Sequence, residues 1–154
     1  MITPKKITEV QGDTFNPFPE PFKSKLGHSE CRSLGDVFGL SQFGVNLELL
    51  APNSRSSLRH WHTKSDEFIY MVEGELILAT NEGEQPLSQG MCVGFPAGIE
   101  NGHCLINRSN TVAKFMVIGS RVSDDKAVYS DDDFSWVVND QNEWIASDKK
   151  GTPY

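Results

Sequence analysis

Short β-prone runs separated by turn residues are the feature that most constrains how this chain folds. Between residues 43 and 118, apolar and β-branched runs alternate with Gly, Pro, Asn and Ser at intervals of roughly 8–12 residues. No stretch keeps a helical period for more than about two turns. The pattern therefore predicts an all-β sandwich or barrel. We expect strands at residues 43–50, 56–62, 67–72, 75–80, 85–87, 91–95, 103–107 and 111–118.

The composition of the chain limits the kinds of partner that it is expected to bind. The chain has 154 residues, which suits one domain, and 14 Lys and Arg against 21 Asp and Glu give a net charge of -7. That balance argues against a nucleic acid or an anionic membrane as partner. The first residues lack the apolar core of a signal peptide, and three cysteines, an odd number, do not suggest a disulfide framework. We therefore expect a cytoplasmic protein that binds a small molecule.

The two ends of the chain differ from its centre. Residues 1–25 hold four prolines interleaved with phenylalanines, which predicts an extended arm that packs on the domain or on a partner subunit. Residues 26–120 form the predicted barrel. Residues 121–154 form an extension in which 134–138 and 144–146 can pair as a hairpin and pack on the barrel or a partner subunit. We expect its acidic runs, 124–125 and 131–133, to be solvated surface rather than a Ca²⁺ site.

A pair of histidines followed by a carboxylate provides the candidate for chemistry. His60 and His62 stand two residues apart, so on a strand their imidazoles project from the same face, and Glu67 and Gly74 follow. If the chain bends between them, Glu67 returns to the same point. Two imidazoles and a carboxylate suit zinc, iron, manganese or nickel. The alternative is that all three are polar residues on the surface of a strand.

Two motifs together resemble those of the cupin superfamily. His60, His62, Glu67 and Gly74 match the first cupin motif in type and spacing, although Ser54 replaces its opening glycine. The second motif is matched by a glycine, a Pro-x-Gly turn and an asparagine, at Gly90, Pro96, Gly98 and Asn107. The position of its histidine holds Asn101, and His103 lies two residues further on, so the turn before it is longer than usual.

The resemblance implies a double-stranded β-helix, the cupin jelly-roll barrel, with an N-terminal arm and a C-terminal hairpin extension. It implies a divalent metal held by His60, His62, Glu67 and His103. If His103 does not reach the metal, two histidines and one carboxylate remain, which is the facial set of non-haem Fe(II) enzymes. The chain looks like a bacterial single-domain cupin of a group often named sugar-phosphate isomerases.

Strand alternation predicts which other side chains face the cavity. Counting from Glu67 and His103, residues 69, 71, 105 and 107 face inward, while 68 and 70 face outward. Asn46 and Asn101 could hydrogen-bond a ligand, or serve as local turn or backbone partners. Arg59 and Cys104 alternate away from the metal. This leaves the predicted cavity without an obvious general base, so we assign no catalytic residue.

The sequence supports three functional hypotheses. The first is a metal-binding cupin that acts on or binds a small oxygen-rich molecule, as a sugar-phosphate isomerase would. The second is an Fe(II)-dependent dioxygenase that uses the same ligands. The third is a non-catalytic module that binds a small molecule. Whether the chain is an enzyme stays open at this point.

We predict that the protein forms a homodimer, because an apolar arm, an apolar tail and open sheet edges favour association. Light scattering should give twice the mass of the 17.1 kDa chain. A mass of one chain at micromolar concentration would contradict this prediction.

Overall fold

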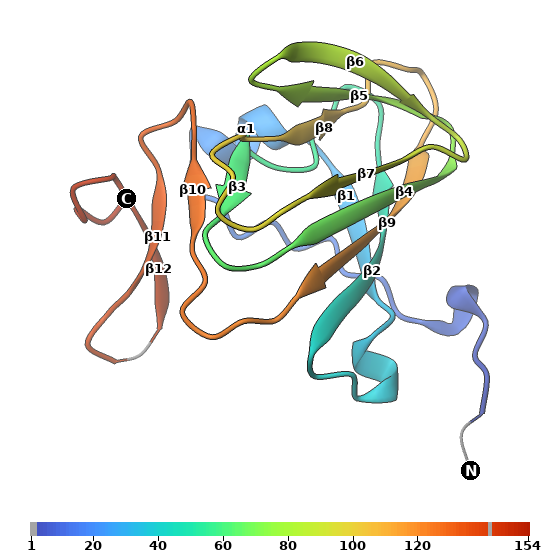
Figure 1. The fold of residues 1–154 in the computed structure, drawn as a ribbon, viewed down its shortest axis with the longest axis horizontal. Coiled ribbons are helices and arrows are strands. Elements are labelled where there is room, and N and C mark those ends of the chain that lie inside the picture. The colour runs from blue at the N-terminus through green and yellow to red at the C-terminus, as the bar shows by residue number, and fades with distance from the viewer. Residues whose placement is uncertain (1–2, 142) are drawn as a thin grey trace.

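A computed structural model describes residues 3–141 and 143–154, so the first two residues of the predicted arm and one residue of the hairpin turn fall outside it. The described chain is mainly strands (Figure 1). They are β1 (Ser29–Ser33), β2 (Phe43–Leu50), β3 (His60–His62), β4 (Glu67–Glu73), β5 (Glu75–Thr80), β6 (Gly83–Ser88), β7 (Cys92–Phe95), β8 (Cys104–Ile106), β9 (Ala113–Ser120), β10 (Ala127–Tyr129), β11 (Ser135–Val138) and β12 (Trp144–Ser147). Three short helices are η1 (Ile7–Glu9), α1 (Phe22–Leu26) and η2 (Asp36–Phe38).

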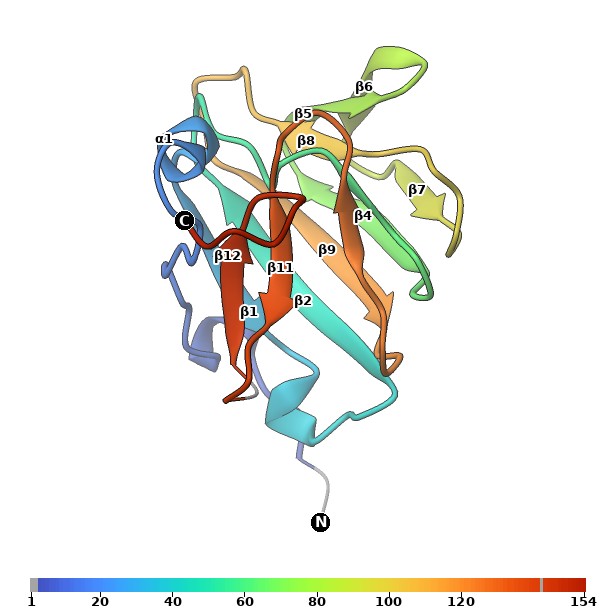
Figure 2. The same ribbon diagram turned by 90° about the vertical axis from the view of Figure 1, so that its left-hand side faces the viewer.

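Two antiparallel sheets form the barrel. One has the order β1-β2-β9-β4-β7 and the other the order β6-β5-β8, so strands distant in sequence lie side by side (Figures 1 and 2). Their facing sides share a core to which β2, β4 and β9 contribute from one sheet and β5, β6 and β8 from the other. This arrangement confirms the predicted all-β jelly roll. Within the described residues, none of the helices has the length and apolar character needed to cross a bilayer.

Strand β4 follows the predicted alternation. Ile69 and Met71 are 3% and 0% exposed, whereas Phe68 and Tyr70 on the other face are 40% and 43% exposed. The strand ends at Glu73 and is followed by Gly74, whose φ of 85° suits glycine. A Cβ there would lie 3.2 Å from Ala113, so the turn between β4 and β5 is built against the neighbouring strand.

The strand predicted at 56–62 is shorter than expected and covers only His60–His62. Ser56 explains part of the difference. Its backbone N–H donates to the carbonyl of Leu105, but the Leu105 N–H donates to the Ser56 hydroxyl instead of to a backbone carbonyl. A side chain thus replaces a backbone acceptor, and the ladder does not continue through this segment.

The two ends of the chain meet in a second apolar cluster. Phe22 and Leu26 of α1 pack with Leu58, Tyr129 and Phe134, and the rings of Phe22 and Phe134 lie 4.9 Å apart. The arm is thus interrupted by helical turns at η1 and α1. The hairpin β11–β12 forms in antiparallel register. This cluster lies behind β3, the strand that carries the two histidines, because β10 pairs directly with it.

We predict that Phe134→Ala lowers the free energy of unfolding by about 3–5 kcal/mol, because it empties a site that is only 1% exposed. Trp144→Ala, in the same hairpin but 62% exposed, is the matched control and should change it by no more than about 0.5 kcal/mol. Urea denaturation measures both. Equal losses for the two variants would show that the second cluster does not anchor the hairpin.

Candidate metal centre

The two histidine motifs meet through the backbone. His60 begins β3, and His103 stands immediately before β8. The His103 N–H donates to the carbonyl of His60 over 2.8 Å, and the His60 N–H donates back over 3.2 Å. Glu67 is the first residue of β4, after a loop that turns the chain back. The bend that the sequence required between His62 and Glu67 is therefore present.

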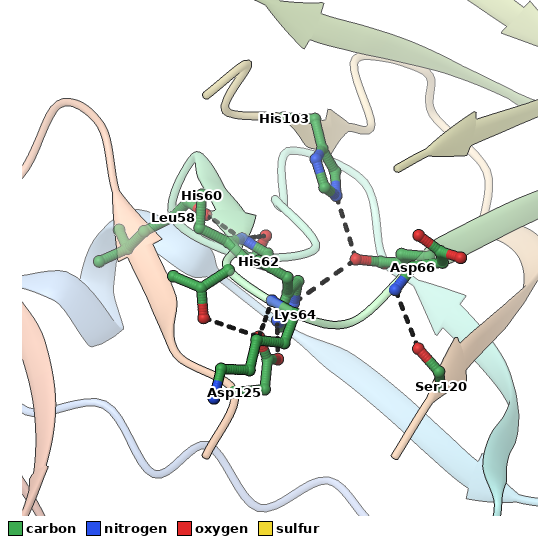
Figure 3. Close-up of polar contacts among 11 residues, drawn as sticks. Leu58, His60, His62, Lys64, Asp66, His103, Ser120 and Asp125 are labelled. Carbon is green, nitrogen blue, oxygen red and sulfur yellow. Dashed lines mark hydrogen bonds and ion pairs between the residues drawn. The ribbon is translucent and has the colours of Figure 1, made fainter. Parts of the chain in front are cut away.

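His60, His62 and Glu67 converge. Their potential ligand atoms all lie within 4.8 Å of one another, so this group could hold a metal ion. The Nε2 atom of His62 lies 3.7 Å from Oε2 of Glu67. His103 is not part of this group of three residues, but its Nε2 lies 3.2 Å from the same carboxylate oxygen. Figure 3 shows the His103 ring pointing toward the group from the opposite side to Asp125.

Hydrogen bonds on the far side of two rings favour metal binding on the near side. Nδ1 of His60 lies 2.9 Å from the carbonyl of Leu58, and Nδ1 of His62 lies 2.7 Å from a carboxylate oxygen of Asp125. Each acceptor favours the tautomer with the proton on Nδ1, which leaves a lone pair on Nε2. Neutral imidazoles and an ionised carboxylate form a donor set that fits a divalent ion.

His103 is held by packing rather than by such a bond. Its residue surface is 2% exposed, and its ring stacks on Phe95 with the centroids 3.5 Å apart and the planes 5° apart. Its buried Nδ1 has no hydrogen-bond partner among the described residues. The stacking fixes the plane of the ring and directs Nε2 toward Glu67.

The pKa values of His60 and Glu67 favour the protonation states that bind a cation. Burial lowers the pKa of His60 to about 4, so its imidazole is neutral at physiological pH. Burial also acts to raise the pKa of Glu67, but the hydrogen bond from His103 and the nearby imidazoles outweigh it, and the pKa falls below its usual range. Glu67 is therefore a carboxylate, and His60 is an uncharged ligand.

Cavities flank the group on two sides. One, of about 200 Å³, is lined by His62, Glu67 and His103 together with Trp61, Thr80, Glu82, Gln85 and Asn101, among others. Another, of about 270 Å³, is lined by His60, His62 and Glu67 together with Asn46, Arg121 and Asp125, among others. Ligands can thus reach the histidines and the carboxylate.

The other residues singled out in the sequence fall in different places. Asn46 and Asn101 line the cavities, but Asn101 is engaged by Glu82 and the backbone N–H of Asn81. Arg59 lines a separate hollow and forms an ion pair with Asp131. Cys104 is buried beside an outer hollow and does not line either metal-side cavity.

The expectation that the acidic runs are solvated surface is wrong for Asp125. The side chain of Asp124 is 86% exposed, but that of Asp125 is only 14% exposed and contacts His62. Burial acts to raise the pKa of Asp125, but the Lys64 N–H and His62 outweigh it and lower that pKa. Two adjacent aspartates look alike in sequence, and a contact across 63 residues leaves no local signal.

A second buried carboxyl was also missed. Glu48 of β2 is paired in register with Phe115, which belongs to the core, so its side chain faces the barrel interior. Burial raises its pKa, and the charge of Glu67 adds to the rise, against a hydrogen bond from Cys31. The alternation of β2 could have revealed Glu48 as an inward-facing residue.

Comparisons with known proteins identify the family. The family model of the cupin domain matches residues 46–119, which span β2 to β9 and all four candidate ligands. A crystal structure described as a sugar phosphate isomerase of the cupin superfamily, from Silicibacter pomeroyi, is 38% identical, with a TM-score of 0.89 over 98% of this chain and 96% of that one. The chain belongs to the cupin superfamily. No curated protein sequence matches it.

Other solved structures share the fold. A protein from Acidithiobacillus ferrooxidans, provisionally named a sugar phosphate isomerase, is 25% identical with a TM-score of 0.81, over 100% of this chain and 95% of that one. A polyketide cyclase from Streptomyces resistomycificus is 20% identical with a TM-score of 0.67, over 86% of this chain and 89% of that one. The latter likeness concerns the fold alone.

The pKa of His60 predicts how the metal-free protein responds to acid. An unfolded histidine titrates near 6.5, above the value of about 4 for folded His60, so below pH 6.5 the unfolded state binds more protons. The free energy of unfolding should therefore fall as pH drops from about 6.5 toward 4. In chelator-treated protein, His60→Gln should flatten this slope by up to about 1.4 kcal/mol per pH unit. Identical slopes for the two proteins would contradict a neutral, buried His60.

Proposed function

We propose that this cupin binds a divalent metal through His60, His62, Glu67 and His103 and acts on a small oxygen-rich molecule, with sugar-phosphate isomerisation as the reaction. The observation that carries the proposal is the convergence of His60, His62 and Glu67, whose potential ligand atoms lie within 4.8 Å of one another beside two cavities. The 38% identity to a cupin described as a sugar phosphate isomerase supports the reaction.

Each of the four side chains has its own role at the proposed metal site. His60 and His62 present Nε2 because their Nδ1 atoms are engaged, Glu67 provides negative charge, and His103 completes the set from the facing motif. When bound, a divalent ion there polarises a carbonyl or hydroxyl oxygen, which favours proton transfer at the adjacent carbon. Of the three histidines only His103 is fully buried, whereas the His62 side chain is 26% exposed and remains open to the cavities.

The cavities suit a polyhydroxylated ligand. The smaller cavity offers the hydroxyl of Thr80, the amide of Gln85 and the carboxylate of Glu82 as hydrogen-bonding groups, with Trp61 as an apolar surface. The larger cavity is lined in part by Arg121, whose guanidinium pairs with Asp36 and is a group suited to contact a phosphate. A sugar phosphate extending between the two would meet both kinds of group.

A dioxygenase is the second candidate. The three residues that converge most closely are two histidines and one carboxylate, the facial set found in non-haem Fe(II) oxygenases. The metal and the oxygen dependence separate the two reactions. A metal-bound protein that converts neither kind of substrate would match the third hypothesis, a non-catalytic binding module.

The setting proposed for this activity is a cytoplasmic homodimer. Cys31, Cys92 and Cys104 are free thiols, as expected in a reducing compartment. Phe68 and Tyr70 on the outer face of β4 are 40% and 43% exposed, and such apolar surface favours pairing of two chains.

We predict that His60→Ala and His62→Ala lose bound metal in the purified protein while they keep the β-sheet circular dichroism of the parent. His28→Ala removes a histidine outside the group and is the matched control, which should keep full occupancy. Elemental analysis measures all four proteins and names the metal. Full occupancy in either site variant would refute the assignment.

The reaction is tested on the metal-loaded protein without oxygen. An isomerase should interconvert aldose and ketose phosphates from a panel of labelled sugar phosphates, and His62→Ala should lower the rate at least about 100-fold. Absence of conversion across the panel would refute the isomerase. Oxygen uptake by the iron form would support the dioxygenase instead.

A further inference from the structure

The segment after the family domain returns to the candidate metal centre. Residues 46–119 match the cupin domain, and the chain then passes through Asp124 and Asp125 into β10. Strand β10 pairs antiparallel with β3, so that Ala127 stands opposite His62 and Tyr129 opposite His60. The C-terminal extension therefore adds a strand directly to the two histidines.

Asp125 is held firmly where this segment crosses the site. One carboxylate oxygen accepts from the backbone N–H of Lys64 over 2.7 Å and from the hydroxyl of Thr63 over 3.1 Å. The other lies 2.7 Å from Nδ1 of His62. The Thr63 hydroxyl in turn accepts from the N–H of Lys126. Figure 3 shows Asp125 on the opposite side of His62 from His103.

This geometry has a chemical consequence for His62. A neutral imidazole carries one N–H, and a carboxylate acceptor at Nδ1 keeps the proton there, so the lone pair of Nε2 points to Glu67, 3.7 Å away. A carboxylate at this position also fixes the orientation of the ring. His60 has no such carboxylate, because its Nδ1 faces two uncharged groups, the carbonyl of Leu58 and the hydroxyl of Ser57.

We propose that Asp125 is a positioning residue for the metal centre, which orients His62 and sets its tautomer from outside the cupin domain. The proposal rests on the proposed function to the extent that the histidines bind a metal. It makes metal affinity depend on the C-terminal extension, which is separate from the two cupin motifs.

A purely structural role is the competing explanation, because Asp125 also ties together Thr63, Lys64 and β10. Thr63→Val tests that explanation. It removes the hydrogen bonds that the Thr63 hydroxyl makes with Asp125 and with the N–H of Lys126, and it leaves the contact between Asp125 and His62 in place. Asp124→Asn removes the same negative charge at the neighbouring residue, whose side chain is 86% exposed. Asp125→Asn keeps an oxygen that can accept from His62 but removes the charge.

The experiment measures two quantities on full-length protein. Competition with a chromogenic chelator gives the Kd for Zn²⁺, and ¹⁵N NMR of the imidazoles in metal-free protein gives the tautomer of His62. Asp125→Ala should weaken Zn²⁺ binding about 10–100-fold and shift His62 toward the form with its proton on Nε2. Asp125→Asn should weaken binding by less and largely keep the tautomer. Asp124→Asn and Thr63→Val should stay within about twofold of the parent.

The outcomes separate this proposal from the proposed function. If the parent protein fails to bind Zn²⁺ while its other readouts are intact, both fail. If the parent binds and Asp125→Ala matches it in Kd and tautomer, only the role of Asp125 is overturned. A loss of affinity in Thr63→Val as large as in Asp125→Ala would also overturn it, because the loss of the Thr63 hydrogen bonds would then explain the effect. Should Asp125→Ala not fold, an Asp125→Asn protein with parental Kd overturns the proposal.

Discussion

The reciprocal backbone hydrogen bonds between His60 and His103 are the constraint on which the site depends. They join two motifs 43 positions apart and fix β3 against the segment that leads into β8. Once that bridge exists, the two imidazoles of β3 and the ring of His103 face the same volume, with centroids 5.1 Å apart for His60 and His103. Glu67 needs only to enter that volume from β4.

Packing around the bridge explains why the histidines are so well held. The barrel core supports β4 and β8 from inside, whereas the second apolar cluster supports β3 from behind through Leu58 and Tyr129. The ring of Tyr129 lies 5.7 Å from that of His60. Both ends of the chain build this second cluster, so the arm and the extension support the candidate metal centre through packing.

Much of the barrel is predictable because its physical cause is local. Alternation of period two distinguishes Ile69 from Tyr70, and turn residues mark where strands end. The pairing of strands in two sheets is not local. Only the resemblance of the two histidine motifs to those of cupins predicted it. The longer turn before His103 left its reach uncertain from the sequence, and the backbone bridge to His60 is what places it beside Glu67.

The features that escaped prediction share a cause. Asp125 carries no spacing signal, because it acts through a contact with a segment far away in the chain. The alternation of β2 places Glu48 inside the barrel, but not its closeness to Glu67, which is also far away in the chain. Strand β10 has three residues, too few for periodicity to reveal. Ser56 replaces a backbone acceptor with its hydroxyl, a choice that propensity does not encode. Long-range pairing of short segments is what sequence patterns represent least well.

X-ray absorption spectroscopy of the Zn²⁺-loaded protein tests most directly whether β3 carries a metal site. It should show nitrogen and oxygen neighbours at about 2.0–2.2 Å with the outer-shell scattering of imidazole rings, which weakens in His62→Ala. A first shell that contains sulfur at about 2.3 Å, or a spectrum that His62→Ala leaves unchanged, would contradict a metal centre built on β3.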